Sequence, residues 1–206
     1  KGYKEGIIYA DGGASESELG GGVCQVASTI YYCALLADFT IVERQPHMYP
    51  VTYVDYGCDA TVYWGAIDFK FKNDNATPIM ITAEASDSYV RVKFVGVNEH
   101  DYTVKMSSEL VSTIPYEEIE NLDETKPVGY RKLEQEPHTG YVYWSYKNYY
   151  DLDGNFIKQE KCDISEYAKY DAKYIVGPEE PEEPEEPELP ELPEDPMDDG
   201  WLDEDH

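Results

Sequence analysis

Basic residues and long apolar runs are both scarce in this sequence. Its 206 residues include 16 Lys and Arg against 43 Asp and Glu, which gives a net charge of −27. Nucleic acids and anionic membrane surfaces are bound mainly by clustered Lys and Arg, so we expect no nucleic-acid partner. The longest apolar stretch, 31–37, is far shorter than the roughly 20 residues that span a bilayer. Because the sequence begins at Lys1 without Met, we expect a truncated N-terminus and membrane attachment only through an upstream anchor.

Cysteine is also scarce, with four residues and no Cys-x-x-Cys pair. This excludes a disulfide scaffold and a zinc ribbon, and we predict neither a metal site nor a cofactor. Cys24 and Cys33 lie nine residues apart, so on a helix they point in nearly opposite directions. They cannot form a disulfide while that helix is intact. We expect Cys33, Cys58 and Cys162 to be structural.

The negative charge is concentrated at one end of the chain. Fifteen of the acidic residues, and no Lys or Arg, lie between Pro178 and His206, where Pro recurs about every third residue. Charge repulsion and proline favour an extended chain without a packed core. The sequence therefore predicts a disordered tail over residues 178–206, and the remainder of the chain is only mildly acidic.

Hydrophobic periodicity predicts an α+β fold in the first part of the chain. Apolar residues from Val23 to Leu35 recur at helical spacing. The period then changes to two in segments rich in β-branched and aromatic residues, which are 40–43, 51–54, 60–64, 68–72, 79–84 and 89–95. Residues 1–98 are therefore expected to form one N-terminal helix packed on an antiparallel sheet. Residues 99–177 are expected to form a small all-β module with strands at 102–106, 140–150 and 155–161.

Cys24 is the first candidate for chemistry, because it follows three glycines and begins the predicted helix. Unpaired backbone N–H groups and the helix dipole favour a thiolate there, and the thiolate is the nucleophilic form of cysteine. We assign Gly22, Gln25 and Thr29 as candidates for binding substrate or an oxyanion. The alternative is that Cys24 is a small residue packed at the start of a helix.

A cysteine nucleophile needs a base and a group that orients the base. His47 follows the 40–43 strand, and Asp59 begins the 60–64 strand, so neighbouring antiparallel strands would place the two side by side. The order Cys24, His47, Asp59 resembles the transglutaminase-like branch of the papain-type cysteine enzymes. Alternatively, His47 is an ordinary loop histidine and Asp59 a turn or cap residue.

A closer resemblance covers roughly residues 1–97. The segment 20–31, Gly-Gly-Gly-Val-Cys-Gln-Val-Ala-Ser-Thr-Ile-Tyr, resembles the signature of the VanW family. The match continues in order through Glu43-Arg44-x-x-His47, Pro50-Val51-x-Tyr53-Val54, Gly57-x-Asp59-Ala60-Thr61-Val62 and Asp68-Phe69-Lys70-Phe71-Lys72-Asn73. Lys1-Gly2-Tyr3 resembles the end of an earlier family motif. The sequence departs from the family at Met48, where Ser is usual, and at Cys33, where Asn or Ala is usual.

Residues 102–177 are similar to the G-five domain, through Pro127-Val128-Gly129, His138-Thr139-Gly140, Asp153-Gly154-Asn155 and Ile175-Val176-Gly177. Together the two resemblances imply an exported protein at the cell surface or wall of a Gram-positive-type bacterium, with peptidoglycan or another wall component as partner. VanW proteins are associated with glycopeptide (vancomycin) resistance, but the family name supplies no reaction.

Two functional hypotheses follow from the sequence. In the first, Cys24, His47 and Asp59 carry out cysteine-dependent acyl transfer or amide hydrolysis on peptidoglycan peptides. In the second, the protein is a non-catalytic wall-binding or scaffold module, and the aromatic residues of 141–150 bind glycan. The plainer explanation of those aromatic residues is β-propensity and core packing.

Overall fold

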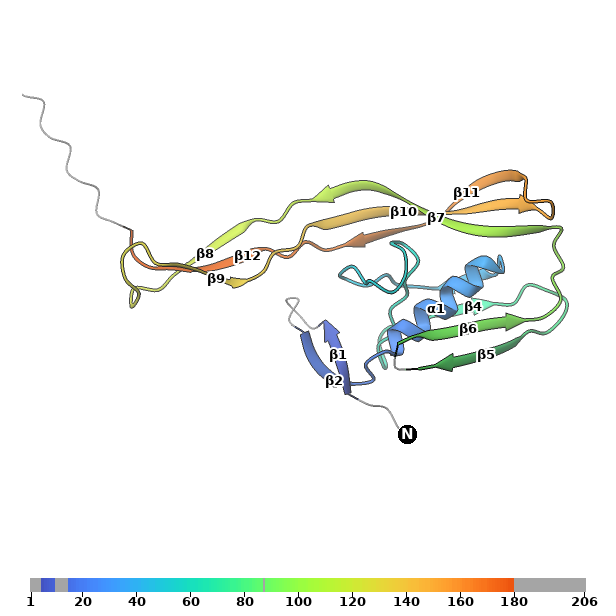
Figure 1. Cartoon of the computed structure of the whole chain (residues 1–206), viewed down its shortest axis with the longest axis horizontal. Coiled ribbons are helices and arrows are strands. Elements are labelled where there is room, and N and C mark those ends of the chain that lie inside the picture. The colour runs from blue at the N-terminus through green and yellow to red at the C-terminus, as the bar shows by residue number, and fades with distance from the viewer. Residues whose placement is uncertain (1–4, 10–14, 87, 180–206) are drawn as a thin grey trace, which may run out of the picture.

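A computed structural model describes residues 5–9, 15–86 and 88–179 of the chain (Figure 1). The predicted disordered tail at 178–206 lies outside these residues except for its first two positions, and the Lys1–Tyr3 motif lies outside them entirely. The described part contains one helix, α1 (Val23–Leu36), and is otherwise built of strands and loops.

Helix α1 is flanked at both ends by a residue with positive φ, Gly22 before it and Asp38 after it. Gly22, at φ 91°, precedes its first turn, a conformation that glycine adopts without the steric cost of a Cβ atom. At the other end, Asp38 has φ 56°, and the N–H groups of Asp38 and Phe39 donate to the carbonyls of Leu35 and Ala34. This is a Schellman motif with Asp in the position usually held by Gly. The Asp38 carboxylate is held by Lys147 at 2.7 Å and by the Tyr102 hydroxyl at 2.8 Å.

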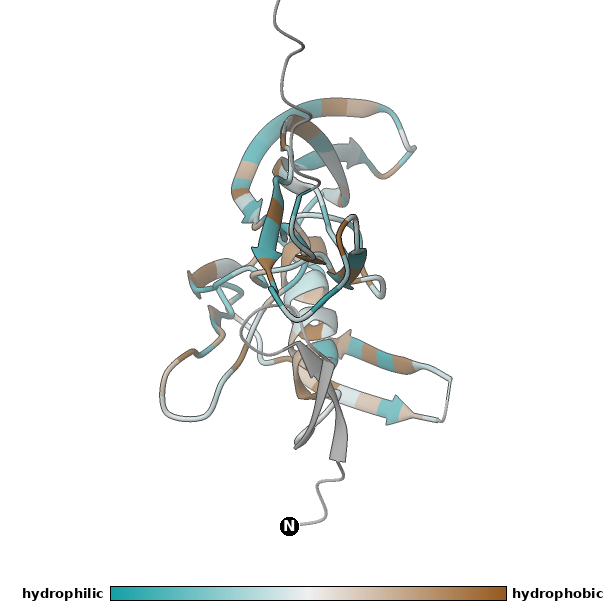
Figure 2. Ribbon diagram, turned by 90° about the vertical axis from the view of Figure 1, so that its left-hand side faces the viewer, coloured by the Kyte–Doolittle hydropathy of each residue, from teal (hydrophilic) through white to brown (hydrophobic). Residues whose placement is uncertain are grey.

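The strands of the described residues form five sheets. Three are two-stranded antiparallel pairs: β1 (Glu5–Tyr9) with β2 (Ser15–Leu19), β3 (Thr40–Glu43) with β4 (Lys70–Lys72), and β5 (Met80–Ala85) with β6 (Val90–Val95). The long strands β7 (Tyr102–Ile114), β10 (Gly140–Asp151) and β11 (Phe156–Tyr167) form an antiparallel sheet with β10 in the centre. In the last sheet, β12 (Ala172–Val176) lies between β8 (Glu118–Leu122), which is parallel to it, and β9 (Arg131–Gln135), which is antiparallel. Figure 2 shows hydrophilic and hydrophobic residues alternating along several of these strands.

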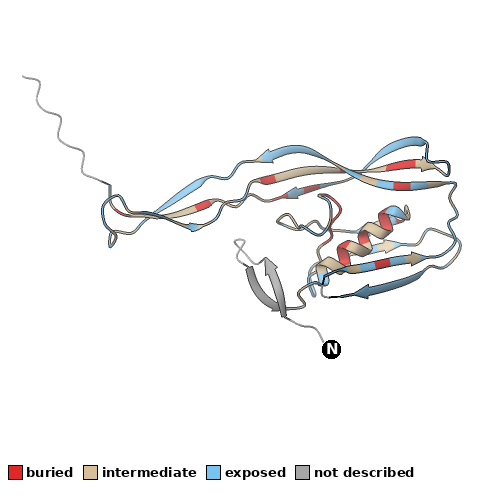
Figure 3. Ribbon diagram, in the orientation of Figure 1, coloured by how far each residue is buried: buried red, intermediate tan, exposed pale blue. Residues whose placement is uncertain are grey.

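The core joins α1 to both halves of the chain. Tyr31 and Leu35 of α1 and Ala60 are buried, and Ile41, Phe69, Met106 and Cys162 pack against them. Met106 lies on β7 and Cys162 on β11, so the long sheet covers the helix. In Figures 1 and 3 the long strands pass along α1, and buried residues line the helix and the loop that lies between them.

The predicted α+β class is wrong. Strands dominate the described part, its single helix has 14 residues, and the strands described before residue 99 form separate two-stranded pairs instead of one antiparallel sheet. Residues 51–54 and 60–64 are not strands, and the chain between β3 and β4 is irregular apart from a bridge between Tyr63 and Ile67. The expected transglutaminase or papain-like layout is therefore absent, because His47 and Asp59 lie on a loop rather than on adjacent strands. The helix and the strands at 40–43, 79–84 and 89–95 are found close to their predicted positions.

Candidate active site

Cys24 lies in the first turn of α1, and its side chain is half-buried. Gly22 has no side chain to cap the helix, and no acidic residue occupies the first turn. The N–H groups of Val23 and Val26 donate to Gly20 and Gly22. No acceptor within the described residues is found for the N–H groups of Cys24 and Gln25, which therefore remain available beside the thiol.

His47 and Asp59 form a closely held pair. The Asp59 side chain is fully buried, and its Oδ2 lies 2.6 Å from His47 Nδ1 and 2.7 Å from the His47 backbone N. Both bonds end on one oxygen, so they fix the orientation of the ring. With Nδ1–H donating to Asp59, the Nε2 atom is left for other partners.

The side chains of His47 and Cys24 are hydrogen-bonded to each other. Burial raises the pKa of Cys24, but the hydrogen bonds with His47 and with the Val62 backbone, together with the charge of His47, outweigh it, and the net pKa is lowered. Burial likewise lowers the pKa of His47, but hydrogen bonds with Asp59 and Cys24 raise it to about 9. The sequence-predicted residues Cys24, His47 and Asp59 are therefore brought together, in an arrangement that favours a thiolate beside an imidazolium.

Asp59 is stabilised as an anion by residues that the sequence analysis did not select. Tyr167 donates its hydroxyl to Asp59 Oδ1 at 2.6 Å, and Arg44 Nη2 lies 3.3 Å from the same oxygen. Arg44 Nε also donates to the Asp59 carbonyl at 2.7 Å. Burial raises the pKa of Asp59, but its bonds with His47, Tyr167 and Arg44 lower it overall. Arg44 was visible within the Glu-Arg-x-x-His motif, whereas no local pattern marks Tyr167.

Short contacts fix the loop against the helix. The buried Ser28 hydroxyl donates to the Ala60 carbonyl at 3.1 Å and accepts the Ala60 N–H at 2.9 Å. Thr61 N–H donates to the Gln45 carbonyl at 2.8 Å, and the Cys24 thiol donates to the Val62 carbonyl at 3.3 Å. The residues on either side of Asp59 are thus positioned relative to the first turns of α1.

The three predicted binding residues have different surroundings. Gly22 precedes the helix in a left-handed conformation, and a Cβ atom there would meet nothing within 4 Å. Gln25 is part-buried beside Cys24, and no hydrogen bond of its side chain is found within the described residues. The Thr29 hydroxyl donates to the Gln25 carbonyl at 2.7 Å, one turn back along α1. That bond occupies the Thr29 proton, so Thr29 is the least suited of the three to stabilise an oxyanion.

The pKa values of the other three cysteines are shifted in the opposite direction from that of Cys24. Burial raises the pKa of Cys33, Cys58 and Cys162, to about 12 for Cys58. All four thiols are free. Cys24 is thus the thiol whose ionised form the protein stabilises.

Neutral and apolar side chains occur on both loop segments of the site. Tyr53 places its hydroxyl 3.2 Å from His47 Nε2, and burial raises the pKa of Tyr53 to about 12, so it is a neutral phenol. Trp64, two residues after Val62, is 97% exposed, and Tyr63 and Met48 are also exposed. Sequence reasoning singled out the aromatics of 141–150 instead. None of those ten residues is exposed, and Tyr143 stacks on Tyr56 with ring centroids 4.4 Å apart.

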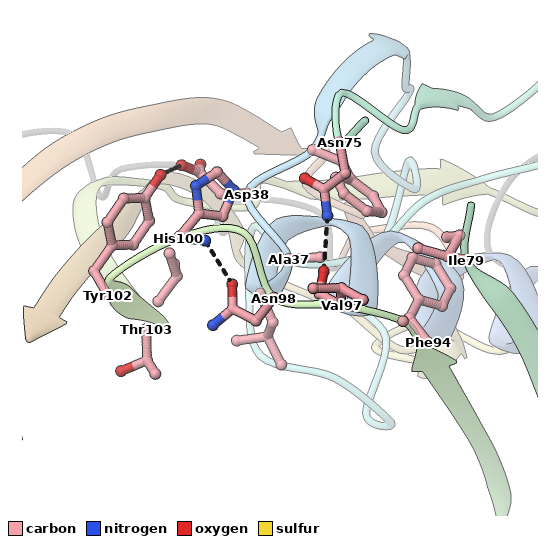
Figure 4. A pocket seen from close by; sticks show the side chains of 14 residues that line it. Ala37, Asp38, Asn75, Ile79, Phe94, Val97, Asn98, His100, Tyr102 and Thr103 are labelled. Atoms are coloured by element: carbon pink, nitrogen blue, oxygen red, sulfur yellow. Dashed lines mark hydrogen bonds between the residues drawn. The ribbon is translucent and has the colours of Figure 1, made fainter. Parts of the chain in front are cut away.

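A separate pocket lies at the opposite end of α1 (Figure 4). It has a volume of about 220 Å³ and is lined by residues that include Phe94, His100 and Tyr102. Asp38, at its edge, is already bonded to Tyr102, Tyr149 and Lys147. The pocket contains no thiol or paired base, so we place the candidate active site at Cys24.

The described residues contain neither a metal-binding cluster nor a membrane-spanning helix. No cluster of three or more His, Cys, Asp or Glu side chains there has the geometry to hold a metal ion. The helix that the structure describes is too short to cross a bilayer.

Comparison with solved structures gives two G5 domains, the kind of module named from the sequence for residues 99–177. The crystal structure of HP0197-G5 is 19% identical, with a TM-score of 0.24, and the match covers 38% of this chain and all of that one. The IgA1 protease G5 domain is 13% identical, with a TM-score of 0.28, and covers 40% of this chain and 98% of its own. At these scores the likeness carries no further argument.

Comparison with known sequences concerns the first half of the chain. YoaR, described as an uncharacterized protein of Bacillus subtilis (strain 168), is 46% identical over 84 residues, which are 41% of this chain and 27% of YoaR. The vancomycin B-type resistance protein VanW of Enterococcus faecalis (strain ATCC 700802 / V583) is 31% identical over 93 residues, which are 43% of this chain and 34% of that protein. This chain therefore spans about a third or less of the length of these relatives. The family model described as VanW like protein matches residues 1–95, so this part of the chain, which holds Cys24, His47 and Asp59, is similar to VanW-like domains.

Proposed function

We propose that this protein is a cell-wall-associated, cysteine-dependent enzyme that transfers or hydrolyses acyl groups of peptidoglycan peptides. The observation that carries the proposal is the contact of a half-buried thiol with an imidazole that is itself held by a buried carboxylate. A packing role for Cys24 requires neither the lowered pKa of the thiol nor the raised pKa of His47. The similarity of residues 1–95 to VanW-like proteins supports the wall as the location of the substrate.

The chemistry follows from the positions of the groups. The Cys24 thiolate attacks the carbonyl carbon of an amide, and the N–H groups of Cys24 and Gln25 are available to the oxyanion that forms. His47 Nε2–H then protonates the amine as the C–N bond breaks, which leaves a thioester on Cys24. Water, or an acceptor amine, gives a proton to Nε2 and attacks the thioester, which releases the acid or the new amide and restores the thiolate.

The surface around Cys24 favours an uncharged part of the substrate. Residues 20–37, 45–54 and 60–67 contain no Asp, Glu, Lys or Arg in a chain of which 29% is charged. The exposed Trp64 adds a planar apolar face close to the segment that contacts the thiol. Aromatic faces of this kind bury apolar surface of a ligand at low entropic cost. We expect this face to contact the substrate next to the bond that reacts.

Alkylation of the full chain with iodoacetamide across pH tests the reactive thiol. Mass spectrometry of peptides that contain Cys24 and Cys162 compares a thiol of lowered pKa with one of raised pKa in the same molecule. We expect Cys24 to react first, with an apparent pKa below the roughly 8.5 of a free thiol. Equal rates for the two cysteines would refute the proposal.

Incubation with purified peptidoglycan tests the reaction itself. The wild type should release or exchange amines from the stem peptides, Cys24→Ala should not, and Cys162→Ala should behave as the wild type. Trapping of an acyl group on Cys24, seen as a mass increase that hydroxylamine removes, would identify the thioester. Turnover that survives in Cys24→Ala would contradict the mechanism.

A second candidate function is wall binding without catalysis, and the exposure of Trp64 is the observation that favours it. A fully exposed Trp is a common feature of binding surfaces. In this case Cys24→Ala should leave sedimentation with purified cell wall unchanged, and Trp64→Ala should abolish it. Binding that is unaffected by Trp64→Ala would remove the support for this alternative.

A further inference from the structure

The end of β11 contacts both loop segments that hold the candidate site. Tyr167, which is 1% exposed, donates its hydroxyl to Asp59 Oδ1 and accepts the Gly57 N–H at 2.7 Å. The next residue, Ala168, donates its N–H to the Met48 carbonyl at 2.7 Å, one residue from His47. We call residues 163–170 the clamp segment. It lies in the module that follows the VanW-like domain, yet it touches the neighbours of both His47 and Asp59.

Arg44 connects the clamp segment to the same carboxylate. Its side chain is 1% exposed, and Nη1 donates to Asp163 Oδ2 at 3.1 Å and to the buried Ser165 hydroxyl at 2.9 Å. Its Nε and Nη2 atoms reach the carbonyl and Oδ1 of Asp59. The guanidinium also lies over the Tyr31 ring, 5.1 Å from its centroid. Arg44 thus cannot move toward or away from Asp59 without breaking bonds to β11.

The two carboxylate oxygens of Asp59 accept hydrogen bonds from different residues. Oδ2 accepts both hydrogen bonds from His47, whereas Oδ1 accepts from Tyr167 at 2.6 Å and from Arg44 at 3.3 Å. A buried carboxylate keeps its charge and orientation only while its oxygens have donors. Without the Tyr167 hydroxyl, the remaining donor to Oδ1 is Arg44 at 3.3 Å. We therefore expect the carboxylate to reorient and the bonds between Oδ2 and His47 to weaken.

We infer that Tyr167 is a positioning residue for the Cys24–His47–Asp59 site, and that the clamp segment makes the β7–β10–β11 sheet part of the active unit. The inference rests on the proposed function and extends it, because residues 1–95 alone lack this donor to Asp59. Tyr167 acts through Asp59 and touches no reacting atom. Its loss should therefore alter how His47 and Cys24 ionise, without removing any group that reacts.

The test compares two tyrosine variants of the full chain. Tyr167→Phe removes the donor to Asp59, and Tyr149→Phe removes the hydroxyl of another buried tyrosine, which bonds to Asp38 at 3.0 Å and Glu160 at 3.1 Å. The readouts are the pH profile of Cys24 alkylation and the NMR titration of the His47 ring. Thermal unfolding confirms that each variant folds. Both variants lose one phenol hydroxyl from the interior, so a merely structural effect should appear in both.

We expect Tyr167→Phe to raise the apparent pKa of Cys24, to lower the His47 midpoint below about 9, and to slow alkylation at pH 7 by about tenfold. Tyr149→Phe should leave both profiles unchanged. The inference is overturned if the two variants behave alike, or if the His47 midpoint rises in Tyr167→Phe because the bare carboxylate becomes more basic.

Failure of the inference can be told from failure of the proposed function. If Cys24 of the wild type reacts no faster than Cys162, the proposed function fails. If the wild type is reactive and Asp59→Asn is not, yet Tyr167→Phe matches Tyr149→Phe, only the inference fails. Should Tyr167→Phe not fold, Ser165→Ala decides the matter, because it removes one anchor of Arg44. The same direction of change supports the inference, and an unchanged profile overturns it.

Discussion

Replacement of Asp59 by Asn should lower the midpoint at which His47 titrates, from about 9 in the wild type to below 6.5. Burial is the largest influence on the His47 pKa and acts downward, so the raised value depends on Asp59 and Cys24. The difference between 9 and the ordinary 6.5 corresponds to about 3 kcal/mol. With Asn at position 59, the His47 ring should be neutral at pH 7.

The thiol should follow the imidazole. Repulsion by Asp59 raises the pKa of Cys24, but this effect is smaller than the lowering by the hydrogen bond and charge of His47. Loss of the imidazolium should therefore raise the pKa of Cys24 by more than loss of the Asp59 charge lowers it, and Cys24 alkylation should shift to higher pH. NMR titration of ¹⁵N-labelled imidazole and iodoacetamide kinetics measure the two effects on the same sample.

Asp38→Asn is the matched control for this experiment. Asp38 pairs with Lys147 at 2.7 Å, as Asp59 does with Arg44 at 3.3 Å, but the described structure shows no contact between Asp38 and His47. Asp38→Asn should leave the His47 midpoint near 9. A wild-type midpoint at or below 6.5 would show that the pKa of His47 is not raised in the folded protein. Equal midpoints in wild type and Asp59→Asn would show that Asp59 does not raise it.

Three further predictions concern stability and binding. Because the pKa of His47 is raised to about 9, the stability that it contributes is complete below pH 6.5 and is lost as pH rises through 9. Urea unfolding should show the advantage of wild type over His47→Gln shrinking by up to about 3 kcal/mol over that range, and a constant difference would contradict it. Trp64→Ala should weaken sedimentation with peptidoglycan but leave the rate of Cys24 alkylation unchanged, and a parallel loss of both would mean that Trp64 supports the fold. Gly22→Ala should cost about 1–2 kcal/mol in thermal unfolding, because a residue with a Cβ atom is strained at φ 91°, and an unchanged melting temperature would show that the helix start adapts.

The sequence sufficed for elements whose signal is local. The helical period from Val23 to Leu35 predicted α1 (Val23–Leu36), since its apolar stripe and its glycine start are both read within one short segment. The period of two likewise predicted β3, β5 and β6. It failed at 51–54 and 60–64, which lie in an irregular loop. Ala60 is buried in the core there, whereas Tyr63 and Trp64 are exposed, so the alternation arises without strand pairing. That failure is the source of the incorrect α+β layout.

Membership of the candidate site was also accessible from the sequence, because Cys24, His47 and Asp59 each lie in a recognisable motif with the chemistry that a thiol site requires. What holds the site together was not accessible. Asp59 and Tyr167 are 108 residues apart, and no local pattern marks a tyrosine of β11 as the donor to a distant carboxylate. Burial and charge at Asp59 depend on which surfaces the folded chain brings into contact. The sequence by itself determined which groups are present for the chemistry, and only the tertiary structure decided that the second module helps to orient them, because long-range packing supplies the donors that a buried carboxylate needs.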